Sequence, residues 1–242
     1  TSFLNNNGYG SGGAIYLESG GTGNSYISNC QFISNGFDDL GGNGGAIFYS
    51  GGSDSLFITS SLFKDNIVSY NNGNGGAIYS YGYISLVNCE VTNNTAFRYP
   101  GIYTNNIEVN FSTITNNTSN NGSLGGGADI YLSNSNFQSI LTNSIIDSYS
   151  NYGDSAPPPI VENIFNDGAT AAKFIDQDHG GYRINIHSPC IGMGSVTEIQ
   201  FDLAGNPRTN PPGSSPDVGC YEHALANTIS DPVGIYISPN GN

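Results

Sequence analysis

The sequence predicts an all-β protein, a parallel β-helix in which each repeat of about 30 residues forms one coil. Three observations lead to this prediction. Two short phrases recur in alternation along the chain, the apolar residues around them follow strand patterns, and each repeat is too small to bury its own apolar face. Stacking the repeats at the β-spacing of about 4.8 Å buries these faces against one another.

The first phrase joins a glycine pair to a small residue, an isoleucine and an aromatic residue. It occurs at residues 12–16, 44–48 and 75–79, and weaker copies occur at 100–103 (PGIY) and 126–131 (GGADIY). The glycines predict a corner that needs a positive φ or a close backbone approach. The isoleucines of this phrase are expected to form one interior aliphatic ladder: Ile15, Ile47, Ile78, Ile102 and Ile130.

The second phrase carries a small residue, a short strand and a closing asparagine. It occurs at residues 29–35 (NCQFISN), 60–66, 88–94 and 111–117, and more weakly at 143–148. An asparagine side chain can satisfy backbone groups at a corner, and asparagine tolerates the left-handed conformation. We expect the closing asparagines to stack at one corner of the coils: Asn35, Asn66, Asn94 and Asn117. Variable stretches between the phrases are predicted to form side loops, where specific recognition would lie.

Composition and charge restrict the partners. The chain has 242 residues, and its 37% hydrophobic and 12% aromatic residues favour a folded protein over a disordered one. Five Lys and Arg stand against 19 Asp and Glu, which gives a net charge of −14. Such a surface repels nucleic acid and anionic lipid, and no apolar run approaches the length of a membrane span. We therefore expect neither nucleic-acid binding nor membrane insertion.

The two phrases together carry a family resemblance. GGAI paired with FxxN resembles the repeats of polymorphic outer-membrane proteins, within the broad pectin-lyase-like family of right-handed β-helices, over about residues 1–150. Residues 173–195, 202–208 (DLAGNPR) and 216–223 (PDVGCYEH) are similar to the C-terminal rungs of bacterial β-helix proteins with a choice-of-anchor Q domain. The resemblance implies β-helix coils over 1–150 and C-terminal rungs over 151–223. The remaining residues, 224–242, resemble a linker and the first strand of a following module, with an ordinary terminal strand as the alternative.

The four cysteines divide into two pairs. Cys30 and Cys89 share a column with Ser61 on the coil between them, so their Cα atoms should lie about 9–10 Å apart, too far for a disulfide. We expect both to be buried and reduced. The resembled pattern has alanine where Cys190 and Cys220 stand, one period apart, which leaves open a disulfide between adjacent coils or two reduced thiols. Their spacing indicates no metal site.

Enzymes of the broad family cleave acidic polysaccharides, and the resemblance therefore raises the question of catalysis. A lyase needs a basic residue beside a cation, and a hydrolase needs carboxylates on neighbouring coils. No clear cluster of either kind is evident, so the acids are expected to be solvated, Asp202 to pair with Arg208, and a calcium site at Asp176 and Asp178 to be the alternative to no cofactor. The scattered histidines have no recognisable nucleophile beside them. The candidate bases are Lys64, Arg98, Lys173, Arg183 and Arg208; the candidate acids are Asp38, Asp39, Asp54, Asp65, Glu90, Asp147, Asp176 and Asp178; the histidines are His179, His187 and His223.

The remaining option is an outer ladder face. Ice binding is disfavoured because Thr59, Thr92, Thr115 and Thr142 form no dense threonine array. Four tyrosines are candidates for stacking on sugar rings, with packing against neighbouring tyrosines as the favoured alternative: Tyr70, Tyr81, Tyr83 and Tyr99. The function expected is that of a non-catalytic, extracellular or cell-surface β-helix segment of a bacterial adhesin or filament. Its expected partners are glycans and further copies or modules joined head to tail; a polysaccharide-active enzyme is the alternative.

Overall fold

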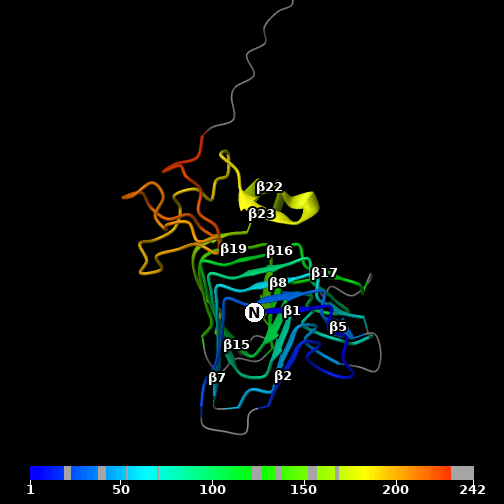
Figure 1. Cartoon of the computed structure of the whole chain (residues 1–242). Helices are drawn as coiled ribbons and strands as arrows, with labels where there is room; N and C mark the ends of the chain where they lie inside the picture. Colours follow the sequence, from blue (N-terminus) through cyan, green and yellow to red (C-terminus); the bar gives the residue numbers. More distant parts are fainter. Residues whose placement is uncertain are drawn as a thin grey trace, which may run out of the picture.

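The computed structural model describes residues 1–18, 23–37, 42–52, 54–69, 71–121, 127–133, 138–151, 157–166 and 169–229. Successive coils stack into a solenoid, and the strand pairs that connect one coil to the next are parallel (Figure 1). The predicted fold class, an all-β parallel β-helix, is confirmed. No helix within the described ranges is long and apolar enough to cross a membrane.

The strands of the coils form four ladders, which we call sheets 1 to 4. Sheet 1 contains β2 (Ile15–Leu17), β6 (Ile47–Tyr49), β10 (Ile78–Ser80), β14 (Ile102–Thr104), β18 (Ile130–Leu132) and β20 (Tyr149–Asn151). Sheet 2 contains β3 (Ser25–Ser28), β7 (Ser55–Thr59), β11 (Tyr83–Val87), β15 (Asn106–Asn110) and β21 (Ile160–Phe165). Sheet 3 contains β1 (Ser2–Leu4), β4 (Gln31–Ile33), β8 (Leu62–Lys64), β12 (Glu90–Thr92) and β16 (Thr113–Thr115). Sheet 4 contains β5 (Gly36–Phe37), β9 (Ile67–Val68), β13 (Thr95–Ala96) and β17 (Thr118–Ser119).

One long strand ties two of these ladders together. β19 (Ile140–Ile146) pairs with β15 through its first half and with β16 through its second half, so sheets 2 and 3 form a single 11-stranded sheet. Between sheets 2 and 3 each coil turns at a residue with a positive φ, which occupies one column through the stack. These residues are Asn29, Ser60, Asn88, Phe111 and Asn143.

The expected isoleucine ladder is confirmed. The sheet 1 register aligns Ile15, Ile47, Ile78, Ile102 and Ile130 in one column. The last four are fully buried. Ile15 is only partly buried because its strand ends the sheet and has a neighbour on one side only. The phrase therefore supplies the aliphatic core of the coils, as predicted.

The glycine pair of the first phrase forms the corner before sheet 1. In the copy at residues 44–48, Gly44 has a φ of 73°, which side-chain-bearing residues rarely adopt. A Cβ on Gly45 would lie 2.1 Å from the carbonyl oxygen of Gly76 on the next coil. The first glycine thus sets the turn, and the second allows two coils to approach. In the weaker copy without the pair, Tyr99 takes a positive φ of 50°.

The expected asparagine ladder is also confirmed, and its hydrogen bonds run from coil to coil. Asn66 Nδ2 donates to the carbonyl oxygen of Phe32 (2.9 Å) and to Asn94 Oδ1 (2.8 Å). Asn66 Oδ1 accepts from the backbone N (3.0 Å) and Nδ2 (2.9 Å) of Asn35. The ladder residues do not themselves take the left-handed conformation. The residue before each does so, since the coil bends there: Ser34, Asp65, Asn93 and Asn116.

An aspartate ends this ladder where another asparagine would otherwise stand. Asp129 Oδ1 accepts from Asn117 Nδ2 (2.7 Å), and Asp129 Oδ2 accepts from the Ser148 hydroxyl (3.0 Å). Burial, with a smaller contribution from the charge of Asp147, raises the pKa of Asp129 to about 7. The folded chain therefore holds a proton on Asp129 that the unfolded chain releases near pH 4.

This difference predicts that Asp129 lowers stability as pH rises from about 4 to about 7. Over that window the folded state binds more protons, so the free energy of unfolding falls, by roughly 4 kcal/mol in total. Asp129→Asn should be similar in stability to the natural chain near pH 4 and more stable by a few kcal/mol at pH 8. Urea unfolding at both pH values, with Glu162→Gln on the exposed side of β21 as control, measures this. A stability difference that does not change with pH would contradict the prediction.

The chain after β21 leaves the coils and folds against the outside of sheet 3. It contains α1 (Ala169–Ala172), β22 (Phe174–Asp176), the 3₁₀ helix η1 (Gln177–His179) and β23 (Gly181–Ile184), with β22 antiparallel to β23. Residues 185–229 are irregular. We call residues 169–229 the C-terminal segment; in Figure 1 it lies beside β16 and β19. The part of the chain from 230 onward, where a further strand was expected, lies outside the described residues.

A small core and three polar contacts hold the C-terminal segment on the coils. Ile145 of β19 packs with Tyr182, Cys190 and Val218 in this second core. Tyr221 Oη donates to Glu90 Oε2 (2.6 Å), the Cys220 backbone N donates to Thr113 Oγ1 (3.1 Å), and Arg208 Nη2 donates to Asn88 Oδ1 (3.1 Å). The acid Glu90 and the threonines of sheet 3 are therefore covered.

All four cysteines are free thiols. The disulfide that was one alternative for Cys190 and Cys220 is therefore not formed, and both side chains are buried. Burial raises the pKa of the Cys190 thiol to about 12. Cys89 is buried as expected, but Cys30 is only partly buried because β4, beside it, is covered by the short strand β1 alone.

Candidate functional site

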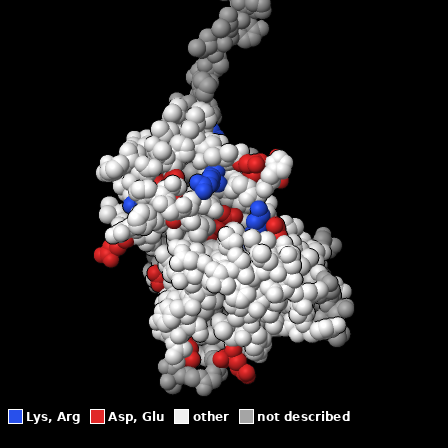
Figure 2. All heavy atoms as spheres, viewed as in Figure 1, with Lys and Arg blue, Asp and Glu red and all other residues white. Residues whose placement is uncertain are grey.

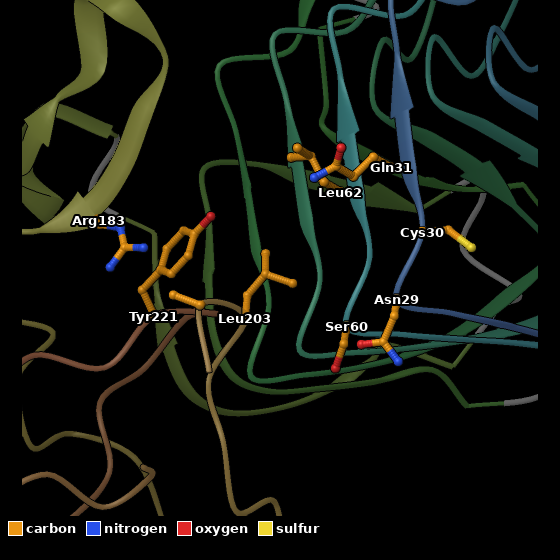
Figure 3. A pocket seen from close by; sticks show the side chains of 9 residues that line it. Asn29, Cys30, Gln31, Ser60, Leu62, Arg183, Leu203 and Tyr221 are labelled. Carbon is orange, nitrogen blue, oxygen red and sulfur yellow. The ribbon is translucent and has the colours of Figure 1, made fainter. Parts of the chain in front are cut away.

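A groove runs between sheet 3 and the C-terminal segment. The coils supply one wall through β4, β8 and the corner before them, and the segment supplies the other (Figure 3). Two adjoining hollows of about 320 and 330 Å³ share Leu62, Arg183 and Tyr221 and so form one elongated groove. The groove exists because the segment covers β12 to β19 and leaves the outer faces of β4 and β8 open.

One half of the groove is lined mainly by uncharged polar groups. Asn29, Gln31 and Ser60 line it from the coils, whereas Leu203 lines it from the C-terminal segment. Arg183 marks its junction with the other half, where the guanidinium lies 5.1 Å from the centre of the Tyr221 ring. Figure 3 shows this guanidinium beside the ring and Leu203 facing the strands.

The other half holds two cations and a buried acid. Lys64 of β8 and Arg183 of β23 line it with Glu90 of β12. Lys64 Nζ donates a long hydrogen bond of 3.4 Å to the carbonyl oxygen of Gly180. Within the described ranges neither Lys64 nor Arg183 has a carboxylate oxygen within 4.0 Å. Figure 2 shows Lys and Arg atoms where the C-terminal segment meets the coils.

Glu90 is the most buried acid of the groove, with 3% of its surface exposed. Its Oε1 accepts from the Thr92 hydroxyl (2.9 Å) and its Oε2 from the Tyr221 hydroxyl (2.6 Å). Burial raises the pKa of Glu90, and these two hydroxyls and then Lys64 and Arg183 oppose the rise. The expectation that Glu90 is a solvated surface acid is wrong, because the C-terminal segment covers it.

The candidate bases do not gather into one site. Lys64 and Arg183 meet in the groove, whereas Arg98 is exposed beside Phe97 and Lys173 lies in the turn between α1 and β22. Arg208 is buried, and its guanidinium faces Glu222 at 3.4 Å. The expected pairing of Arg208 with Asp202 is wrong.

Asp202 instead organises the turn that carries Arg208. Its Oδ1 accepts from the backbone N atoms of Ala204 (2.9 Å) and Asn206 (2.7 Å), and its Oδ2 accepts from the backbone N of Glu222 (2.9 Å). The carboxylate is therefore occupied within its own loop.

The other candidate acids are dispersed. Asp65 is exposed at a left-handed corner, Asp54 is partly buried, and Asp147 accepts from the Thr115 hydroxyl. Asp38 and Asp39 lie outside the described residues, as does Tyr70. Asp176 is exposed and bonds to His179 Nδ1 (2.7 Å), and Asp178 is exposed nearby. No three His, Cys, Asp or Glu side chains in the described ranges lie close enough to hold a metal ion.

The remaining histidines are separate from the groove. His187 Nδ1 bonds to the carbonyl oxygen of Ile229 (2.8 Å). The backbone N of His223 donates to Asp217 Oδ2 (2.6 Å), and burial lowers the pKa of its ring. Neither ring lines either hollow of the groove.

Aromatic side chains form ladders on the outside of the coils. On sheet 1 the rings stack along the axis with centroid separations of 4.5–5.4 Å: Tyr16, Phe48, Tyr79, Tyr103 and Tyr131. Tyr81 packs edge-on against Tyr79, and Tyr99 stacks on Tyr131. Tyr83 packs edge-on against Phe57. Tyr81, Tyr83 and Tyr99 thus pack against neighbouring rings, the favoured alternative for these residues.

The groove was missed because its two walls are far apart in sequence. Lys64 and Arg183 are separated by more than a hundred residues, and Glu90 belongs to another coil. The signal that could have located it was the outward position of Lys64 and Glu90 on adjacent strands of sheet 3. Alternation along each strand predicted that position, but nothing predicted which face the C-terminal segment covers.

Comparisons with known proteins do not extend this description. No family model matches the chain, and no curated protein or solved structure matches it significantly.

Proposed function

We propose that this chain is a non-catalytic β-helix segment of an extracellular bacterial surface adhesin or filament, which provides rigid extension and makes contacts through its outer faces. The observation that carries the proposal is the continuous asparagine ladder from Asn35 to Asp129. Each link is a buried side-chain hydrogen bond that crosses from one coil to the next. A stack linked in this way resists bending and separation of its coils.

Two further features support this role. The repeats at residues 1–150 resemble those of polymorphic outer-membrane proteins, and the DLAGNPR and PDVGCYEH phrases resemble choice-of-anchor Q rungs; both groups are surface proteins of bacteria. The outer aromatic ladder on sheet 1 presents Tyr16 and Tyr81, which are 54% and 50% exposed. Flat exposed rings of this kind can contact sugars or another protein.

The alternative is a polysaccharide-active enzyme with its site in the groove. Glu90 beside Lys64, Arg183 and Tyr221 is the arrangement that favours it. Against it, both oxygens of Glu90 accept hydrogen bonds from neighbouring hydroxyls, and Glu90 lacks a second carboxylate among the described residues that line the same hollow at hydrolytic spacing, other than exposed Asp176.

Glycan array binding and a uronate-lyase absorbance assay on the same preparation test the proposal. We expect the purified chain to bind a subset of glycans, or a surface of its own kind, without forming unsaturated uronate products or new reducing ends. Turnover that is lost in Glu90→Gln and retained in Asp54→Asn would contradict the proposal and establish the enzyme. The pair is matched because each substitution removes one carboxylate from an outward-facing region of the coils.

A further inference from the structure

The groove has the size and shape of a ligand site. Its two hollows together fall in the range of volumes that binds small molecules, and they lie end to end along β8. Leu62 and Leu203 supply apolar surface, and Tyr221 adds an aromatic ring. A short, extended ligand can therefore lie across the coils under the C-terminal segment.

The charges of the groove favour an anion. Lys64 and Arg183 are two of only five Lys and Arg in a chain of net charge −14. Within the described ranges neither has a carboxylate oxygen within 4.0 Å, and the nearby Glu90 directs both of its oxygens at hydroxyl groups. Asp176, the other acid of this half, bonds to His179. Two cations thus line the groove with their ion-pairing capacity unused, which favours a ligand carboxylate or sulfate.

The uncharged groups favour a carbohydrate over other anions. The half of the groove beyond Arg183 presents the side chains of Asn29, Gln31 and Ser60 next to Leu203 and the Tyr221 ring. Amides and hydroxyls beside an apolar surface match the alternating hydroxyl edges and C–H faces of sugar rings. A long polyanion such as nucleic acid is disfavoured, because the rest of this acidic surface would repel it.

We propose that the groove binds a short anionic oligosaccharide, with a carboxylate or sulfate group held between Lys64 and Arg183 and neighbouring sugars lying against Tyr221, Gln31 and Asn29. This inference rests on the proposed contact function and names a ligand class and a location for it. The outer aromatic ladder is on a different face, so a glycan bound there would not depend on Lys64 or Arg183.

Titration calorimetry of the whole chain with defined probes tests the inference. The probes are a galacturonic acid trisaccharide, a sulfated trisaccharide, the neutral galactose trisaccharide and triglutamate. We expect one or both anionic trisaccharides to bind at least about ten-fold more tightly than the neutral one, with affinity falling as salt rises. The preferred probe then distinguishes carboxylate from sulfate recognition.

Matched variants locate the site. Lys64→Gln and Arg183→Gln should each weaken binding of the preferred anionic trisaccharide by about ten-fold or more, whereas Arg98→Gln, the same charge change outside the groove, should leave it unchanged. Lys64→Arg should retain binding. Circular dichroism of each variant verifies that the coils remain folded.

Three results would overturn the inference: no binding of either anionic trisaccharide, equal affinity in Lys64→Gln and Arg183→Gln, or tighter binding of triglutamate. If array glycans still bind all variants equally, the groove inference fails while the proposed contact function stands. If no glycan or copy of the chain binds any variant, both fail.

Discussion

Replacing Asn66 with leucine should destabilise the β-helix by at least about 4 kcal/mol. The side chain makes four buried hydrogen bonds to three residues on the neighbouring coils. Leucine has a similar volume but leaves the Asn35 donors and the Phe32 carbonyl without these partners. Each buried polar group left unsatisfied costs about 1–3 kcal/mol, and a typical domain has only 5–15 kcal/mol of total stability.

Asn66→Asp separates the loss of hydrogen bonds from the loss of shape. The carboxylate still accepts from Asn35, but it cannot donate to the Phe32 carbonyl or to Asn94 Oδ1, and its charge is buried. We expect a loss of similar size at pH 8. At low pH the protonated acid regains one donor, so part of the stability should return.

Urea unfolding followed by circular dichroism measures both variants, and Asn120→Leu is the control. Asn120 is exposed, and its backbone rather than its side chain holds the coil, through a bond from its N to the Ala96 carbonyl. A loss of under 1 kcal/mol in Asn66→Leu would contradict the prediction and would mean that packing alone aligns the coils at this corner.

The parts of the fold that repeat could be predicted from the sequence. Ile78 and Asn66 recur at one period with the same neighbours, and in a stack a shared period places equivalent residues in one column. Alternation along the strands then separates core from surface. Local physics is sufficient here, because each coil repeats the problem that its neighbours solve.

The parts that do not repeat could not be predicted. The left-handed residue lies one position before the ladder asparagine, a difference that depends on how the chain bends and not on residue type, since Ser34 and Asp65 both adopt it. Glu90 has the sequence context of a solvated acid. Its burial depends on where residues 185–229 fold back, and that segment has neither a period nor regular elements from which to infer its path.

Arg208→Met should release the C-terminal segment from sheet 3 while leaving the coils folded. Arg208 connects the two parts: Nη2 donates to Asn88 Oδ1 on the coils (3.1 Å), and Nη1 donates to the Gly219 carbonyl (3.2 Å) and to Glu222 Oε2 (3.4 Å) within the segment. The guanidinium also lies 4.4 Å from the centre of the Phe111 ring. One side chain thus joins a coil corner to two parts of the segment.

The expected loss is large because the ion pair is buried. Neither the Arg208 nor the Glu222 side chain is exposed at all. Burial already raises the pKa of Glu222 to about 7, with the nearby Asp217 adding to the rise and Arg208 opposing it. Methionine fills similar space but leaves this acid without its cation, and removing one partner of a buried pair typically costs about 3–5 kcal/mol. The small second core of the segment is the only other apolar attachment evident in the described ranges.

Hydrogen exchange distinguishes local release from global unfolding. In Arg208→Met we expect amides bonded across the junction, such as those of Gly219 and Cys220, to lose protection, while Ile47 and Ile78 keep theirs. Arg98→Met, which removes an exposed cation, is the control. Arg208→Met together with Glu222→Gln should recover part of the protection, because the second change removes the uncompensated acid. Unchanged protection of Gly219, or equal loss of protection at Ile78, would refute the clasp role of Arg208, since the first means that other contacts hold the segment and the second that segment and coils unfold as one unit.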